Sequence, residues 1–131
     1  MIGLDTNVIV RYLAQDDPEQ SARASGVIDG LTAAEPGFVC LVAVVETYWV
    51  LRSAYGQSRA RCADLIDGLL DARELRVGDA AIARRATAAC REGADFADVV
   101  IAELGRVARC ETTMTLDRRA ALGGRMILVG G

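Results

Sequence analysis

The 131-residue chain contains no histidine and no lysine, so all fifteen of its positively charged side chains are arginine. Without histidine, the chain lacks the commonest general base and the commonest metal-binding side chain. Without lysine, it can form neither a Walker-type phosphate loop nor a Schiff base, and Ser–Lys catalysis is excluded. Carboxylates, hydroxyls, thiols and arginine remain as the groups available for chemistry.

Signals for membranes and secretion are also missing. No apolar run reaches the ~20 residues that a membrane span requires. The N-terminus lacks the charged start and small-residue cleavage site of a signal peptide, so we expect a cytoplasmic protein without membrane contact. The net charge of −3 gives no overall attraction to nucleic acid. Nucleic-acid binding would therefore depend on local arginine clusters or on a bound metal ion.

The four cysteines are widely spaced and form no CxxC pair, which argues against zinc binding and dithiol redox chemistry. We expect all four to be reduced thiols buried in the core, because cysteine is among the most often buried residues. They are Cys40, Cys62, Cys90 and Cys110.

Length and composition predict one globular domain over residues 1–131. Strand-like segments at 1–4, 38–41, 75–77, 112–116 and 126–129 alternate with helical segments. The expected helices cover residues 6–14, 19–31, 42–53, 58–72, 79–91 and 95–109. This alternation favours an α/β fold, a three-layer α/β/α sandwich with a mostly parallel central sheet.

Acidic residues stand where such a fold binds ligands, beyond the carboxyl ends of the strands. Asp5 follows the first expected strand and Asp117 the fourth, although either acid can also be explained as a helix cap or turn residue. Glu46 is the only charge in "VAVVETYWVL", a helix that we expect to be buried all round. A buried lone carboxylate requires either an arginine partner or a cation.

Two further acids, Asp95 and Asp98, lie at the start of the segment "DFADVVIAEL". Capping of the helix explains Asp95 well but Asp98 only partly, because Asp98 lies about 140° round the helix from Glu103. If the acids meet, they need a positive charge between them, since like charges raise one another's pKa. Mg²⁺ and Mn²⁺ prefer oxygen ligands, and either ion can activate water and stabilise a phosphodiester transition state.

The segments "LDTNVIVRYL", "LVAVVETYWVL", "GADFADVVIAELG" and "TLDRRA" follow one another across nearly the whole chain. Together they resemble a PIN domain, and most closely the VapC-type toxins of bacterial toxin–antitoxin pairs. The resemblance implies a Mg²⁺- or Mn²⁺-dependent endoribonuclease that leaves a 5′-phosphate.

The resemblance also assigns the site. The expected metal-binding and catalytic acids are Asp5, Glu46, Asp98 and the more variable fourth acid Asp117. Asn7 and Thr115 match polar residues that hold these carboxylates in place, whereas Asp95 is treated as a helix cap.

Arginine and partner assignments follow from the same motifs. Arg11, Arg118 and Arg119 lie nearest to them and are candidates for RNA phosphate contacts, with exposed surface charge as the alternative. Ala120 departs from the family pattern, because many relatives have an aromatic residue there. The resemblance further implies a homodimer, and an antitoxin whose basic tail inserts beside the acids in a hetero-oligomer.

Two other functions remain open from the residues. The chain could be a non-catalytic PIN-like module that binds RNA or protein. It could also be an aspartate-based phosphatase or phosphoryl-acceptor domain, although such domains pair their aspartate with a lysine, and Asn7 replaces the second acid of their DxD pattern.

Overall fold

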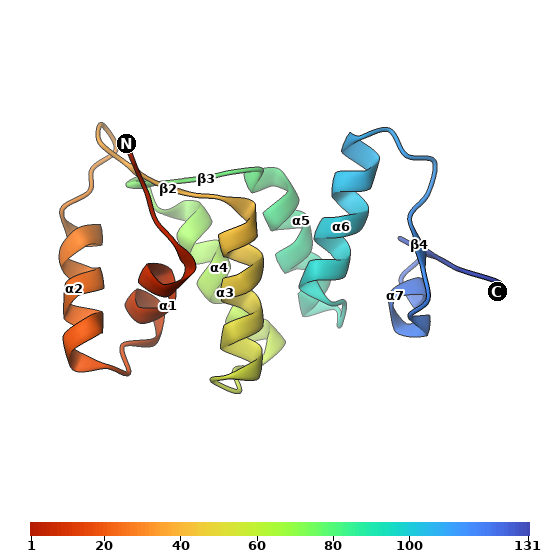
Figure 1. Cartoon of the computed structure of the whole chain (residues 1–131), viewed down its shortest axis with the longest axis horizontal. Coiled ribbons are helices and arrows are strands. Elements are labelled where there is room, and N and C mark those ends of the chain that lie inside the picture. The colour runs from red at the N-terminus through yellow and green to blue at the C-terminus, as the bar shows by residue number, and fades with distance from the viewer. The chain divides into compact units, whose positions relative to one another are not determined.

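The computed structural model describes residues 1–131 and divides into two compact units, Met1–Ala80 and Ala81–Gly131. Figure 1 shows the first unit in red to green and the second in teal to blue. Helices and parallel strands occur in both units, which confirms the predicted α/β class.

A three-stranded parallel sheet lies in the first unit, in the order β1 (Ile2–Gly3), β2 (Gly37–Val39) and β3 (Leu75–Val77). Each strand lies where the sequence predicts one. Gly37 begins β2, one residue before the predicted strand, and a Cβ at this position would lie 2.8 Å from the side chains of Leu4 and Leu31. Glycine therefore lets the strand approach its neighbours closely.

The helices of the first unit also agree with the predicted segments to within about two residues. They are α1 (Thr6–Ala14), α2 (Pro18–Asp29), α3 (Leu41–Ser53) and α4 (Arg59–Asp71). Side chains of Asp5, Asp17 and Ser58 cap three of them, and Pro18 occupies the first turn of α2. Their buried faces supply much of the core of this unit, including Ile9, Val44, Leu51 and Ile66.

The prediction that α3 is buried all round is wrong. Val44 and Leu51 are buried, but Val42 and Trp49 are each 67% exposed, and Glu46 is exposed as well. Only the residues at helical spacing on one side of α3 pack inwards. Exposed apolar side chains are common on protein surfaces, so an apolar sequence does not require burial on every side.

The second unit contains most of α5 (Ala80–Arg91), followed by α6 (Phe96–Val107), β4 (Met114–Thr115), α7 (Arg118–Leu122) and β5 (Ile127–Leu128). β4 and β5 form a two-stranded parallel sheet. The sequence pattern does not predict the helix α7. It does allow Asp117, the residue before α7, to act as a helix cap. Phe96 and Val99 are buried on α6.

All four cysteines are free, but only half of the burial prediction is correct. Cys62 and Cys90 are buried on helices, whereas Cys40 and Cys110 are exposed. Cys40 occupies the N-cap position of α3 and Cys110 follows the end of α6, so both lie on connecting segments. None of the helices is both long and apolar enough to cross a bilayer.

Candidate functional site

Asp5 stands where β1 leads into α1. The N–H of Leu4 donates to the Phe38 carbonyl at 2.8 Å, so pairing with β2 continues to the residue before Asp5. The Asp5 Oδ1 atom then accepts from the Val8 N–H at 3.1 Å and caps α1. This confirms the predicted cap, which uses one carboxylate oxygen of an exposed residue and leaves Oδ2 open to a ligand.

Glu46 extends from α3 to the start of α1. The Thr6 hydroxyl donates to its Oε1 atom at 3.1 Å, and Thr6 directly follows Asp5. The expectation of a buried Glu46 is therefore wrong, because the carboxylate is exposed and has a hydroxyl partner. Two carboxylates thus lie at the N-terminus of α1, where the helix dipole stabilises negative charge.

Thr6 supports one of these acids, Glu46, although the sequence motif points to Asn7 for that role. Asn7 is exposed and makes no side-chain hydrogen bond in the first unit, whereas Thr6 holds Glu46. The only signal for Thr6 in the sequence is a hydroxyl beside Asp5 at the first position of the helix. The role assigned to Asn7 stays a prediction.

In the second unit, Asp98 lies in the first turn of α6, and Asp95 caps the same helix. The Asp95 Oδ2 atom accepts from the Asp98 N–H at 3.1 Å. Partial burial raises the pKa of the Asp98 carboxyl, and the negative charges of Asp95 and Asp117 raise it further. These three acids are therefore close enough in space to repel one another.

Asp117 caps α7. Its Oδ1 atom accepts from the N–H groups of Arg119 at 2.8 Å and Ala120 at 3.4 Å. The Thr115 hydroxyl accepts from the Asp117 N–H at 3.0 Å, so Thr115 fixes the backbone of Asp117. Thr115 thus acts on the main chain rather than on a carboxylate.

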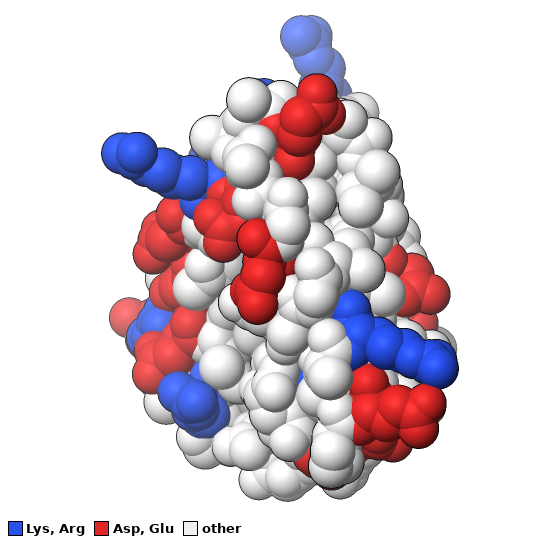
Figure 2. All heavy atoms as spheres, turned by 90° about the vertical axis from the view of Figure 1, so that its left-hand side faces the viewer, with Lys and Arg blue, Asp and Glu red and all other residues white.

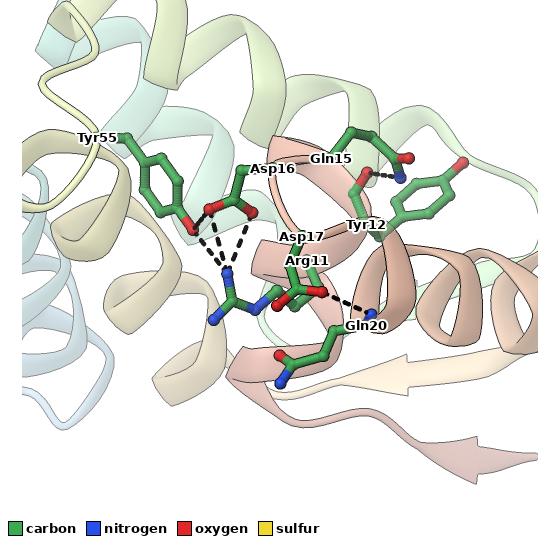
Figure 3. Close-up of polar contacts among 7 residues, drawn as sticks. All are labelled: Arg11, Tyr12, Gln15, Asp16, Asp17, Gln20 and Tyr55. Carbon is green, nitrogen blue, oxygen red and sulfur yellow. Dashed lines mark hydrogen bonds and ion pairs between the residues drawn. The ribbon is translucent and has the colours of Figure 1, made fainter.

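The three candidate phosphate-binding arginines differ in availability. Arg118 and Arg119 are exposed at the start of α7, directly after Asp117. Arg11 is already engaged, because its Nη1 atom lies 3.1 and 3.2 Å from the two oxygens of Asp16 and 3.2 Å from the Tyr55 hydroxyl (Figure 3). The Tyr55 hydroxyl in turn donates to Asp16 at 2.8 Å.

This cluster connects the end of α1 to the loop after α3. The hydrogen bond from Tyr55, followed by that from Arg11, lowers the pKa of the Asp16 carboxyl. The same contacts with Asp16 raise the pKa values of Arg11 and Tyr55. Arg11 therefore has a structural partner, whether or not it also contacts RNA.

The predicted acids are divided equally, with Asp5 and Glu46 in the first unit and Asp98 and Asp117 in the second. Neither unit alone brings three acidic or cysteine side chains close enough to bind a metal ion. The donor set is entirely carboxylate oxygen, the chemistry that suits Mg²⁺ and Mn²⁺. Burial, followed by the negative charges of Asp95 and Asp117, raises the pKa of Asp98, and a bound cation would favour its charged form.

The PIN domain model matches residues 2–122, a range that contains all four predicted acids. No curated protein matches the chain.

Proposed function

Because the chain belongs to the PIN domain family, whose members are generally nucleases, we propose that it is a metal-dependent endoribonuclease and the toxin of a toxin–antitoxin pair. The cytoplasm is the proposed place of action. The full set of acids in the matched range supports a catalytic member over a module that only binds RNA or protein.

The proposed metal ligands are Asp5, Glu46, Asp98 and Asp117, with Mg²⁺ or Mn²⁺ as the ion. The observation that carries this proposal is the placement of Asp98, half-buried in the first turn of α6 beside two other acids. Within the second unit, no side chain donates a hydrogen bond to its carboxylate. A half-buried acid beside two like charges is disfavoured in its charged form, and a bound cation would stabilise that form.

A bound divalent ion would supply Lewis-acid activation of water and stabilise charge on the phosphodiester. The chain itself would hold the reacting groups. Thr6 orients Glu46, and Thr115 orients Asp117 through its backbone. Since histidine and lysine are absent, a carboxylate of this group is the proposed acceptor for the proton of the attacking water. Arg118 and Arg119 are the proposed contacts to the substrate phosphates.

An antitoxin with a basic tail is the proposed partner, together with a second copy of the chain in a hetero-oligomer. The first unit has seven arginines against twelve acidic residues, a formal charge of −5, which suits a basic tail. Glu46 and Trp49 lie one turn apart on α3, so an exposed apolar side chain accompanies the acid. These features support the proposal.

RNA cleavage by the purified chain tests the proposed function. The assay compares Mg²⁺, Mn²⁺ and EDTA, with Asp98→Asn as the test variant and Asp29→Asn, an exposed acid at the end of α2, as its matched control. We expect cleavage that requires the metal, disappears in folded Asp98→Asn and persists in Asp29→Asn. Metal-dependent RNA binding without turnover would instead indicate the non-catalytic module.

A further inference from the structure

The two units differ in charge. The second unit has eight arginines against six acidic residues, a formal charge of +2, whereas the first carries −5. Figure 2 views the first unit from its α2 side and shows acidic side chains spread over this face, with arginines standing between them. Three of the six acids of the second unit, Asp95, Asp98 and Asp117, form the group around Asp98. The rest of that unit therefore has eight arginines against three acids, an excess that attracts an RNA backbone.

A pair of arginines in this unit shares one buried carboxylate. The Glu103 side chain on α6 is only 9% exposed. Its Oε2 atom lies 3.4 Å from Arg85 Nη1 on α5, and its Oε1 atom lies 3.5 Å from Arg106 Nη1 on α6. These three residues and Val107 line a surface depression of about 330 Å³.

One arginine would be enough to compensate a buried carboxylate, so the second leaves an excess positive charge. The Arg85 and Arg106 side chains are 59% and 77% exposed. Each guanidinium has five N–H donors and approaches Glu103 through Nη1, so most donors remain available. Glu103 also keeps two like charges close together, the arrangement that a phosphate group with two free oxygens can bridge.

We infer that Arg85 and Arg106, held in place by Glu103, bind a backbone phosphate of the RNA substrate. This inference rests on the proposed nuclease function and adds residues that the motifs did not indicate. On α6, Glu103 lies five residues, or about 7.5 Å along the axis, beyond Asp98 and on a different side of the helix. The phosphate bound here is therefore not the one that is cleaved, and the site acts on binding. Val107 gives the depression an apolar wall for the ribose.

The test is the salt dependence of RNA binding by the full chain. Labelled single-stranded RNA is titrated in EDTA, which prevents metal-dependent cleavage, at several NaCl concentrations. In R85Q/R106Q we expect about tenfold weaker binding at fixed salt. We also expect the slope of log K against log salt concentration to fall in magnitude by about 0.7 for each phosphate that the variant no longer neutralises.

Two control variants accompany this test. R85K/R106K keeps both charges and should retain the slope. Arg23→Gln is the matched control, because Arg23 pairs with an exposed Glu19 at 3.1 Å and should leave binding unchanged.

Removal of both arginines leaves Glu103 buried without a partner, so the triple variant R85Q/E103Q/R106Q is measured as well, with circular dichroism to confirm folding. Wild-type affinity and slope in the folded triple variant would overturn the inference. If the slope is unchanged but inorganic phosphate raises the Tm of wild type alone, the site takes a free phosphate and the RNA assignment fails. Binding of an acidic peptide that depends on both arginines, with RNA binding unchanged, would equally overturn it in favour of a protein partner.

Cleavage separates this inference from the proposed function. A triple variant that binds and cleaves RNA like wild type would exclude the phosphate site and leave the nuclease intact. A wild-type chain that neither binds nor cleaves RNA with any metal would remove the proposed function itself, and the phosphate site with it.

Discussion

Three acids of the candidate region each cap a helix: Asp5 caps α1, Asp95 caps α6 and Asp117 caps α7. In each case one carboxylate oxygen accepts the backbone N–H groups. The second oxygen stays available, so capping and metal binding do not exclude each other. The preference of aspartate for N-caps therefore explains where these acids stand without deciding what they bind.

Thr6 offers the sharpest test of a single hydrogen bond. Thr6→Val keeps the shape of the side chain but removes the hydroxyl that donates to Glu46. We expect metal-dependent RNA cleavage to fall roughly two- to tenfold, the effect of removing one hydrogen bond that orients the carboxylate. Thr6→Ser keeps a hydroxyl and should restore the rate. An unchanged rate in a folded Thr6→Val chain would show that this bond does not orient Glu46 for catalysis.

Asp98 should lower the stability of the metal-free chain. Its raised pKa reflects partial burial and repulsion from Asp95 and Asp117, so its charged form is disfavoured in the folded state. Asp98→Asn removes this charge, and we expect the free energy of unfolding in EDTA at neutral pH to rise by about 0.5 kcal/mol, after allowance for solvent screening. Thermal denaturation measures the gain. A lower Tm than wild type would contradict it.

Contacts between residues far apart in the sequence could not be predicted from the sequence alone. Thr6 and Glu46 are separated by 40 positions, and Arg85 and Glu103 by 18. No local pattern indicates such partners, because they depend on how helices pack. The capping acids were predictable since a cap is a property of a few consecutive residues.

At the scale of elements, most helices and strands could be predicted from the sequence. Capping residues, Pro18 and the alternation of apolar segments give their approximate limits. The five-residue helix α7 is too short to show helical periodicity. For α3, the sequence does not indicate which side is exposed. The buried side of a helix can be recognised only when polar residues mark the opposite side, and α3 has almost none.

Alanine substitutions on the buried and exposed sides of α3 should change the free energy of unfolding by different amounts. Leu51 is 1% exposed, and Leu51→Ala should lower the free energy of unfolding by about 2–5 kcal/mol. Trp49 is two-thirds exposed, and we expect Trp49→Ala to cost less than about 1 kcal/mol despite the larger side chain removed. Urea denaturation measures both. Similar large losses would mean that Trp49 packs inside the protein.

The Arg11–Asp16–Tyr55 cluster should give the fold a contribution that depends on pH. The folded pKa of Asp16 is lowered, so this contribution is present above the unfolded value of about 3.9 and is lost as the pH falls through the folded pKa. Asp16→Asn should therefore have a lower Tm than wild type at pH 7, with a difference that shrinks on acidification. Thermal melts across this range, with Asp29→Asn as control, measure the effect. A difference independent of pH would exclude the ion pair as its source.

At the scale of the whole molecule, charge is divided along the chain. The first unit is strongly acidic and the second is basic outside the group around Asp98. The overall charge of −3 conceals this division, which is why composition gave no sign of nucleic-acid binding. In the proposed nuclease, the basic part attracts the substrate, and the acids that repel RNA are neutralised by the metal.

Metal binding by the full chain tests whether the four acids act on the same ion. With Mn²⁺ at about 100 times its Kd, wild type should be stabilised by about 2.7 kcal/mol, or roughly 10 °C in Tm. Glu46→Gln and Asp98→Asn alter different units, and each alone should remove most of this increase. The double variant should then lose little more, because partners of one ion are not additive. If one single variant keeps the full increase, the ion is bound by the acids of the other unit alone, and the shared site is excluded.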